Sequence, residues 1–192
     1  MNLDLFKRPV VLIAAAIVVV IGVLVLYVMP SGSVHAPQSL AALVPAKSPV
    51  SVPDVAFTDG VGKRHMLSEF RGHYVLLNMW ATWCAPCVKE LPALQHLQDG
   101  TAGSNFAVVP VNVGRSDALD TAKFLMGHGA GKLSVNVDTT LAVMRTLHVY
   151  GLPVTVLIDP KGREIARAEG PADWDAPDAI AYFKSLASQQ PG

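Results

Sequence analysis

This 192-residue chain has only two cysteines, Cys84 and Cys87, and they stand three positions apart. They come shortly after the apolar run 74–80, at the point where a helical pattern begins. A helix N-terminus offers unpaired amide N–H groups and a partial positive charge, which stabilise a thiolate on the first cysteine. The second cysteine, one turn deeper, can then attack a mixed disulfide and release the partner. The pair predicts dithiol–disulfide exchange, with Cys84 as the exposed nucleophile and Cys87 as the shielded resolving thiol.

A structural disulfide or a metal site would be the alternative use of this cysteine pair. Closing so short a ring adds only about 2 kcal/mol in the chain-entropy model, against ~4.7 kcal/mol for a 100-residue loop. A zinc ribbon needs a second Cys-x-x-Cys, which the sequence lacks, and a c-type haem site needs His where Val88 stands. We therefore expect no metal site and no cofactor other than a redox-active disulfide.

An apolar block at residues 10–29 contains no charged residue. As a helix it would be roughly 30 Å long, which is enough to cross a bilayer core. Lys7 and Arg8 stand just before the block and the next basic residue is Lys47, so the positive-inside bias places residues 1–9 in the cytoplasm. This pattern predicts a single-pass signal anchor in a bacterial inner membrane, with the catalytic domain in the periplasm.

Cleavage after Ala36 is the alternative to an uncleaved anchor, because small or modest residues stand at suitable offsets before that position. The h-region of a signal peptide usually spans about 7–15 residues, and this block is longer, which favours the anchor. With either outcome the rest of the chain is exported, and we expect its compartment to be oxidising.

Beyond the anchor the chain is long enough for one domain and nearly balanced in charge. Residues 31–192 contain 13 Lys and Arg against 14 Asp and Glu, with no basic run or stripe. The sequence therefore lacks the basic patch that nucleic-acid binding requires, and we expect proteins as partners. Prolines among Ser, Ala and Gly residues predict a flexible linker over 30–52, which would tether a domain spanning 53–190.

Within that domain, hydrophobic periodicity and turn residues predict alternating strands and helices. The expected elements are a hairpin (55–67), strands at 74–80, 106–113, 133–137, 155–158 and 164–168, and helices at 86–98, 118–128, 139–147 and 176–187. Alternating strands and helices followed by a C-terminal hairpin favour an α/β fold with a mixed central sheet.

Residues 77–92, which contain Trp-Cys-Ala-Pro-Cys, and residues 151–162 together resemble the thioredoxin superfamily. Within it they are similar to the TlpA/ResA-like branch of membrane-anchored, extracytoplasmic oxidoreductases, and residues 169–174 resemble the C-terminal part of TlpA. The resemblance covers about residues 50–188. It implies a thioredoxin-like three-layer domain with an N-terminal β-hairpin extension, preceded by one transmembrane helix.

The resemblance also implies roles for residues near the two cysteines. Pro153 is expected to be the cis-proline of the fold, which presents the backbone of Leu152 as an edge for a substrate segment and keeps metals off the dithiol. Glu90 stands three residues after Cys87 and so on the same helical face. A glutamate at this place is expected to tune thiol ionisation and to pass a proton to the resolving cysteine. The alternative for Glu90 is a solvated surface glutamate.

Three further residues flank or separate the cysteines. Trp83 is expected to form part of the surface on which protein partners dock, with core packing as its alternative. Ala85 and Pro86 are expected to contact the substrate together with Trp83 and Leu152. They are also expected to set the redox poise, because the intervening dipeptide alters the amides around the thiolate. Asn78 stands where thioredoxin carries a buried aspartate thought to act as a base. Since asparagine cannot ionise, we expect that function at Glu90.

These features predict an enzyme that reduces disulfides in protein substrates and is recharged by a transmembrane electron donor of the DsbD/CcdA type. The resemblance points to the cysteines of apocytochrome c or of copper sites in oxidase assembly as clients. A DsbA-like dithiol oxidase is an alternative. It would be expected to carry a helical insertion, for which the link from Val113 to Leu133 leaves little room.

A Sco-like copper metallochaperone is the alternative from a different functional class. Its pattern resembles Cys-x-x-x-Cys with a distant histidine, so the cysteine spacing here is one residue shorter, and His128 or His148 would have to serve. A peroxiredoxin-like peroxidase is disfavoured, because the Pro-x-x-x-Thr-x-x-Cys pattern is not met at Cys84.

Overall fold

Eight strands form one mixed sheet in the computed structural model, which describes residues 36–188. The order across the sheet is β1-β8-β7-β4-β5-β6-β2-β3, and β4 pairs in parallel with β5 and antiparallel with β7. The strand that ends just before the cysteines, β4, therefore lies inside the sheet, and the expected mixed sheet is confirmed. In chain order the strands are β1 (Leu43–Ser51), β2 (Ala56–Asp59), β3 (Arg64–Met66), β4 (Tyr74–Trp80), β5 (Phe106–Asn112), β6 (Asn136–Val137), β7 (Val154–Ile158) and β8 (Arg163–Glu169).

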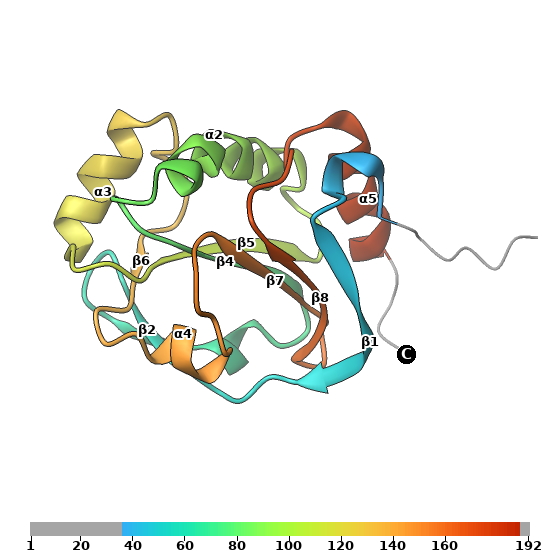
Figure 1. Cartoon of the computed structure of the whole chain (residues 1–192), viewed down its shortest axis with the longest axis horizontal. Coiled ribbons are helices and arrows are strands. Elements are labelled where there is room, and N and C mark those ends of the chain that lie inside the picture. Colours follow the sequence, from blue (N-terminus) through green and yellow to red (C-terminus); the bar gives the residue numbers. More distant parts are fainter. Residues whose placement is uncertain (1–35, 189–192) are drawn as a thin grey trace, which may run out of the picture. The chain divides into compact units, whose positions relative to one another are not determined.

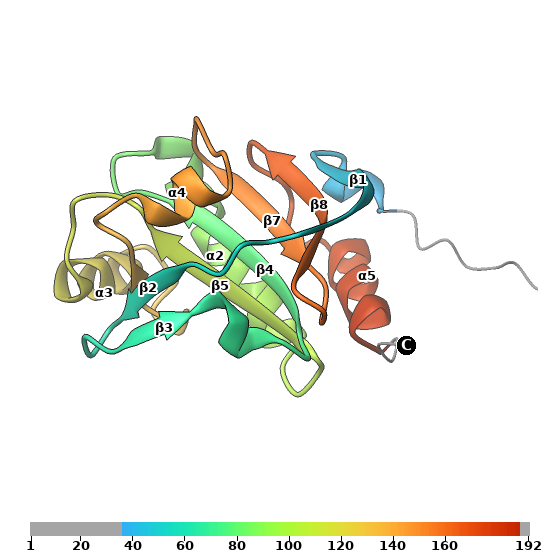
Figure 2. The same cartoon turned by 90° about the horizontal axis from the view of Figure 1, so that it is seen from below.

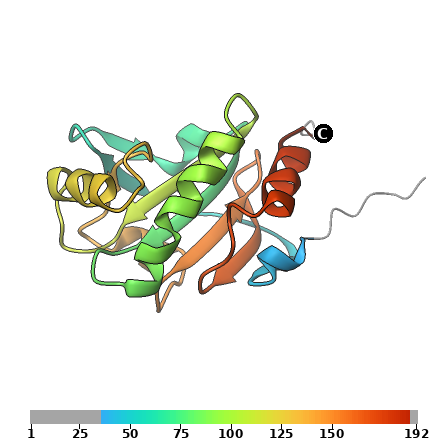
Figure 3. The same cartoon turned by 90° about the horizontal axis from the view of Figure 1, so that it is seen from above.

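Helices cover both faces of this sheet and give the three layers that the resemblance implies. Figure 1 shows α2, α3 and α5 on one face and α4 on the other, and Figure 3 shows α2 lying over the sheet beside α5. Two short 3₁₀ helices, η1 and η2, complete the fold. The helices are η1 (Gln38–Leu40), η2 (Leu67–Phe70), α2 (Ala85–Gly100), α3 (Ala118–Gly127), α4 (Ala142–Thr146) and α5 (Pro177–Ser188).

Strand β4 shows why the central part of the sheet is apolar at nearly every position in the sequence. All seven of its residues are buried. Leu76 and Trp80 belong to the core that includes α2 and α5, whereas Leu77 and Met79 belong to the core that includes α4. Side chains alternate between the two faces of a strand, so a strand covered on both faces needs apolar residues at successive positions.

The expected N-terminal hairpin is present as β2 and β3, whose residues pair antiparallel. It lies at one edge of the sheet, where β2 also pairs with β6 (Figure 2). Figure 2 also shows α4 on the face of the sheet that is turned toward the viewer.

Two elements are shorter than the sequence predicts. The strand expected at 133–137 is only Asn136–Val137, and the helix expected over 139–147 is Ala142–Thr146. The cause is Asp138, whose carboxylate accepts hydrogen bonds from the backbone N–H groups of Thr140 (3.0 Å) and Val143 (2.7 Å). A short acidic side chain that bonds nearby amides favours a turn over a strand or helix.

Residues 36–52 belong to the fold, so the prediction of a flexible linker over 30–52 is wrong for this part. Leu40 of η1 and Leu43 of β1 are buried in the core that includes α5. Strand β1 pairs antiparallel with β8 and forms an edge of the sheet. An edge strand tolerates proline because the sheet does not use its outward N–H groups. The same prolines that suggest a linker are therefore compatible with a strand.

The predicted signal anchor at 10–29 and the cytoplasmic residues 1–9 lie outside the residues that the structure describes. Between Ala36 and Ser188, none of the helices has both the length and the hydropathy that crossing a bilayer requires.

Replacing Leu40 tests whether the segment before β2 is part of the cooperative fold. Leu40→Ala should lower the free energy of unfolding by about 2–5 kcal/mol, because it removes a fully buried side chain from the core. Val44→Ala is the matched control, since Val44 is 62% exposed and its loss should change the value by at most about 0.5 kcal/mol. Urea unfolding of the purified full-length chain measures both values, and equally small effects would contradict the assignment.

Candidate active site

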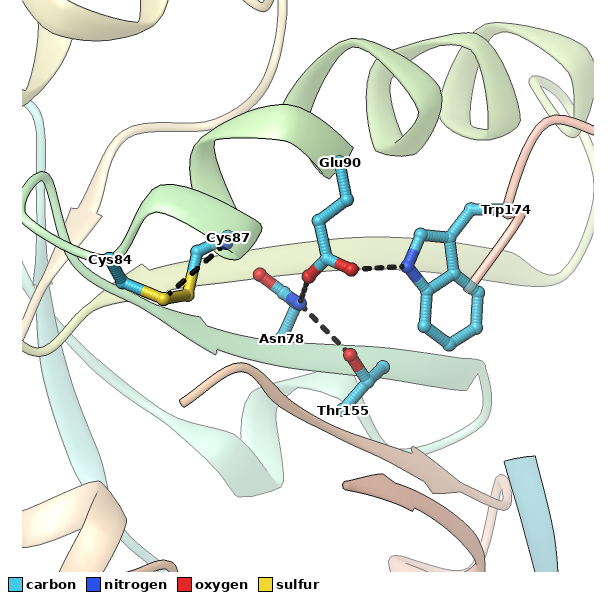
Figure 4. The surroundings of a disulfide bond; sticks show 6 residues. All are labelled: Asn78, Cys84, Cys87, Glu90, Thr155 and Trp174. Carbon is cyan, nitrogen blue, oxygen red and sulfur yellow. Dashed lines mark hydrogen bonds between the residues drawn. A yellow bond between two sulfur atoms is a disulfide. The ribbon is translucent and has the colours of Figure 1, made fainter. Parts of the chain in front are cut away.

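The two cysteines form a disulfide at the N-terminus of α2, with sulfur atoms 2.01 Å apart (Figure 4). Cys84 is the N-cap residue, and its sulfur accepts a hydrogen bond from the backbone N–H of Cys87 at 3.4 Å. After reduction, the same amide and the helix dipole would stabilise a Cys84 thiolate. Cys84 is 5% exposed and Cys87 is fully buried. Cys84 is thus the more accessible of the two cysteines, as predicted. The prediction that Cys84 is exposed is wrong for the disulfide form.

Pro153 lies at the same end of the sheet as the cysteines. Its peptide bond with Leu152 is cis, as the resemblance implies. The proline directly precedes β7, and the pairing of Met79 with Val154 brings it alongside the end of β4 that leads into the disulfide. Leu152 is half-buried and packs against both cores.

Exposed side chains surround the disulfide at the protein surface. Trp83 is 72% exposed, so core packing, which was its alternative, is wrong, whereas Trp80 is a core residue. Ala85 and Pro86 are exposed on the first turn of α2. The structure therefore places three of the predicted docking residues on the surface next to the nucleophile, with the backbone of Leu152 at the same end of the sheet.

Glu90 is buried one turn beyond Cys87, with only 4% of its surface exposed. Its carboxylate accepts one hydrogen bond from Asn78 Nδ2 (2.9 Å) and one from Trp174 Nε1 (3.1 Å), as Figure 4 shows. The alternative of a solvated surface glutamate is therefore wrong.

Burial raises the pKa of Glu90 to about 7 from its ordinary value of 4.5. The cause is desolvation, which penalises the charged form, and the hydrogen bonds from Trp174, Asn78 and the Ala172 backbone oppose it only in part. A carboxyl group with a pKa near 7 gains and loses its proton at neutral pH, which suits acid–base chemistry. Glu90 is among the residues of α2 and of the loop before α5 that line a groove.

Asn78 stands in the middle of β4 and is fully buried. Its Nδ2 donates to Glu90 and also to Thr155 Oγ1 at 2.9 Å, whereas its Oδ1 has no hydrogen-bond partner among residues 36–188. In Figure 4 this oxygen points to the side on which Cys87 lies. An unpaired buried acceptor costs roughly 1–3 kcal/mol, so the fold retains it against a stability penalty.

Sequence reasoning missed the contact between Trp174 and Glu90. Residues 169–174 carried only a family resemblance, and the contact joins residues 84 positions apart. Trp174 is fully buried in the loop before α5. A buried indole N–H usually finds an acceptor, which was a usable signal, but sequence spacing cannot say which acceptor it finds.

Within residues 36–188, His, Cys, Asp and Glu side chains form no group of three that could hold a metal ion. His128 and His148, of which a copper site would need one, are both exposed. His128 stacks on Phe124, with ring centroids 3.9 Å apart. Neither histidine belongs to a metal-binding group in this part of the chain.

Known proteins resemble this chain in sequence and in structure. The family model described as Redoxin matches residues 47–182. The thiol-disulfide oxidoreductase ResA of Bacillus subtilis is 35% identical over 118 residues, which are 62% of this chain and 65% of ResA. ResA of Geobacillus kaustophilus is 36% identical over 112 residues, which are 58% of this chain and 63% of the relative. The matched regions thus span slightly less than two thirds of the length of these two relatives.

Among solved structures, a Chlorobium tepidum protein assigned as the thiol:disulfide interchange protein DsbE is similar with a TM-score of 0.62 and 28% identity. The match covers 71% of this chain and 98% of that protein. The described fold is therefore shared over nearly the whole of the neighbour.

Replacing Glu90 by glutamine tests its burial and its ionisation together. Folding raises the pKa of this acid, so the folded state binds the proton more tightly than the unfolded state. Its contribution to stability is therefore full below about pH 4.5 and is lost as the pH rises through about 7. Glu90→Gln should leave stability nearly unchanged at pH 4.5 and raise it at pH 8, by up to about 3 kcal/mol.

Urea unfolding at pH 4.5, 6 and 8, with the disulfide intact, measures this effect. Glu169→Gln is the matched control, because Glu169 is exposed and its replacement should have the same small effect at all three values. An effect of Glu90→Gln that does not depend on pH would contradict the raised pKa.

Proposed function

Because the chain belongs to the Redoxin family, as a ResA/TlpA-like member of the thioredoxin superfamily, we propose that it is a thiol–disulfide oxidoreductase that reduces protein disulfides. One observation carries the proposal. The Cys84–Cys87 disulfide caps the N-terminus of α2, and the Glu90 carboxylate lies buried one turn beyond it. A staple for the fold would need neither the helix N-terminus nor a carboxylate that titrates near neutral pH.

Reduction of a client begins with the Cys84 thiolate of the dithiol form. It attacks one sulfur of the client disulfide, the other client sulfur leaves as a thiolate, and a mixed disulfide joins Cys84 to the client. Cys87 then loses its proton and attacks Cys84 Sγ, which forms the Cys84–Cys87 bond and releases the second client thiolate. Two electrons pass from the dithiol to the client.

Glu90 is the proposed acceptor for the Cys87 proton. Cys87 is fully buried, so bulk water cannot deprotonate it directly. Glu90 stands three residues later on the same helix, and its pKa of about 7 allows it to take up a proton and return it at neutral pH. The groove that Glu90 helps to line is the proposed route by which the proton leaves to solvent.

Client binding is proposed to use the surface around the disulfide. The backbone of Leu152 next to Pro153 would pair with an extended client segment, and Trp83 would cover its apolar side chains. Ala85 and Pro86 on the first turn of α2 would set the redox poise. The exposure of Trp83, Ala85 and Pro86 supports their proposed contact with clients.

A dithiol that reduces clients in an oxidising compartment needs a supply of electrons. We propose a transmembrane donor of the DsbD/CcdA type, and a signal anchor at residues 10–29 that holds the domain on the periplasmic side of a bacterial inner membrane. The apolar block that follows Lys7 and Arg8 supports the anchor and its orientation. Cysteines of apocytochrome c or of copper sites in oxidase assembly are the proposed clients, on the basis of the TlpA/ResA-like resemblance.

The reduction potential of the cysteine pair tests the direction of the reaction. We expect a value near that of thioredoxin, about −270 mV, when the purified chain is equilibrated against a glutathione or dithiothreitol buffer. A value nearer −120 mV, as in DsbA, would make the disulfide the active form and would contradict the reducing direction.

Trapping of mixed disulfides tests the assignment of the two cysteines. Cys87→Ser removes the resolving thiol, so mixed disulfides between Cys84 and its clients should accumulate on non-reducing gels of whole cells. Cys84→Ser is the matched control, because the buried Cys87 that remains should trap no client. Equal trapping by both variants would contradict the assigned roles.

A further inference from the structure

Trp174 makes a hydrogen bond to Glu90 that the proposed exchange mechanism does not use. Its indole Nε1 donates to Glu90 Oε2 at 3.1 Å, and both residues are buried. Trp174 lies in the loop between β8 and α5, whereas Glu90 is on α2. Figure 4 shows the indole on one side of the carboxylate and Asn78 on the other.

The chemistry of an indole fixes what this contact can do. Its N–H group is a donor only and cannot accept a hydrogen bond. Oε2 of Glu90 must therefore remain an acceptor, whether the carboxyl group is charged or neutral. A proton on Oε2 would weaken the contact, because the hydroxyl oxygen of a carboxylic acid is a poorer acceptor than its carbonyl oxygen.

We propose that Trp174 is a positioning residue that holds Oε2 of Glu90, so that the carboxyl proton is gained and lost at Oε1, beside Asn78. The use of this proton in disulfide exchange rests on the proposed function, but its position on Oε1 does not.

The loop that carries Trp174 is held on two sides, as a positioning role requires. Asp175 Oδ2 lies 2.9 Å from Nδ1 of His96 on α2. The backbone N–H of Asp173 donates to the carbonyl oxygen of Ser39 in η1 at 3.2 Å. The indole also packs against Phe183 of α5, with ring centroids 6.4 Å apart. The neighbours of Trp174 are thus fixed to α2 and η1, and its own ring packs against α5.

Asn78 can adapt its hydrogen bonds when Oε1 gains a proton. In the present arrangement Asn78 Nδ2 donates to Oε1 and to Thr155, and Oδ1 is unpaired within the described part of the chain. A protonated Oε1 becomes a donor and cannot face the Nδ2 donor. A half-turn of the amide places Oδ1 against the new O–H group, and the Thr155 hydroxyl then donates to Oδ1 instead of accepting.

The same half-turn moves an N–H group to the side of Cys87, where Oδ1 now points (Figure 4). The proton that leaves the Cys87 thiol arrives on Glu90 Oε1, and the thiolate left behind meets an amide donor in place of an acceptor. No electron is transferred in this step, and the proton is conserved. Trp174 thereby directs the proton to Glu90 Oε1, the oxygen to which the Asn78 amide can reorient.

Trp174→Phe tests the positioning role, because it keeps an aromatic ring in the core and removes the N–H donor. The test uses the oxidised full-length chain with ¹³C-labelled glutamate, and the Glu90 signal is assigned by its absence from Glu90→Gln. The hydrogen bond favours the charged carboxylate, so its loss should move the Glu90 midpoint upward from about 7 by about one pH unit. The pH profile of disulfide exchange by the reduced variant should move by the same amount.

Trp80→Phe is the matched control, because Trp80 is a buried tryptophan of the same core whose ring packs against Phe124. It should leave the Glu90 midpoint unchanged. A wild-type midpoint in Trp174→Phe, or an equal shift in Trp80→Phe, would overturn the proposal.

A second measurement holds even if Trp174→Phe does not fold. The chain has three tryptophans, so ¹⁵N labelling gives three indole signals, of which Trp83 reports an exposed ring. The Trp174 indole and the Asn78 side-chain amide should both shift with the Glu90 midpoint, and Glu90→Gln should abolish both shifts. A Trp174 signal that stays constant through the Glu90 titration would overturn the proposal. A chain that reduces no protein disulfide would instead overturn the proposed function, and these titrations would still decide the position of the proton.

Discussion

Removal of one carboxylate from water is the constraint that organises the region around the disulfide. A buried charge is tolerated only if donors surround it, and Glu90 finds them on β4, in Asn78, and on the loop before α5, in Trp174. Those donors offset only part of the rise in pKa that desolvation causes, so the carboxyl group titrates near pH 7. Helix α2, strand β4 and the loop before α5 are thereby joined at one point beside the two cysteines.

Local patterns predicted the parts of the fold that depend on neighbouring residues in the chain. The run of β4, apolar except for Asn78, identified a strand buried on both faces, and the Cys-x-x-Cys after it identified the start of α2. The cis form of the Leu152–Pro153 bond came from the family resemblance, because spacing alone favours a trans proline. Glu90 was placed correctly on the face of Cys87, but its burial depends on a loop that lies about eighty residues further along the chain.

The errors have a common physical cause, which is that composition does not reveal tertiary partners. Residues 36–52 have the prolines and small residues of a linker, yet Leu40 and Leu43 find a core beside α5, and β1 finds an edge at β8. Asp138 looked compatible with a strand that continues into a helix, but its carboxylate bonds two nearby backbone amides and makes a turn. The contact of Trp174 with Glu90 is of the same kind, because only the folded chain brings the two together.

The loop between β8 and α5 influences the ionisation of Glu90 and lies outside the Cys-x-x-Cys motif. Residues 83–87 are fixed by the chemistry of the two sulfurs, and changes there alter nucleophile, resolving thiol and docking surface together. The loop meets Glu90 through the indole N–H of Trp174, which donates to Oε2, and through the backbone of Ala172. Proteins with an identical Trp-Cys-Ala-Pro-Cys segment can therefore differ in the acidity at which they work, and selection or engineering can reach that property through the loop alone.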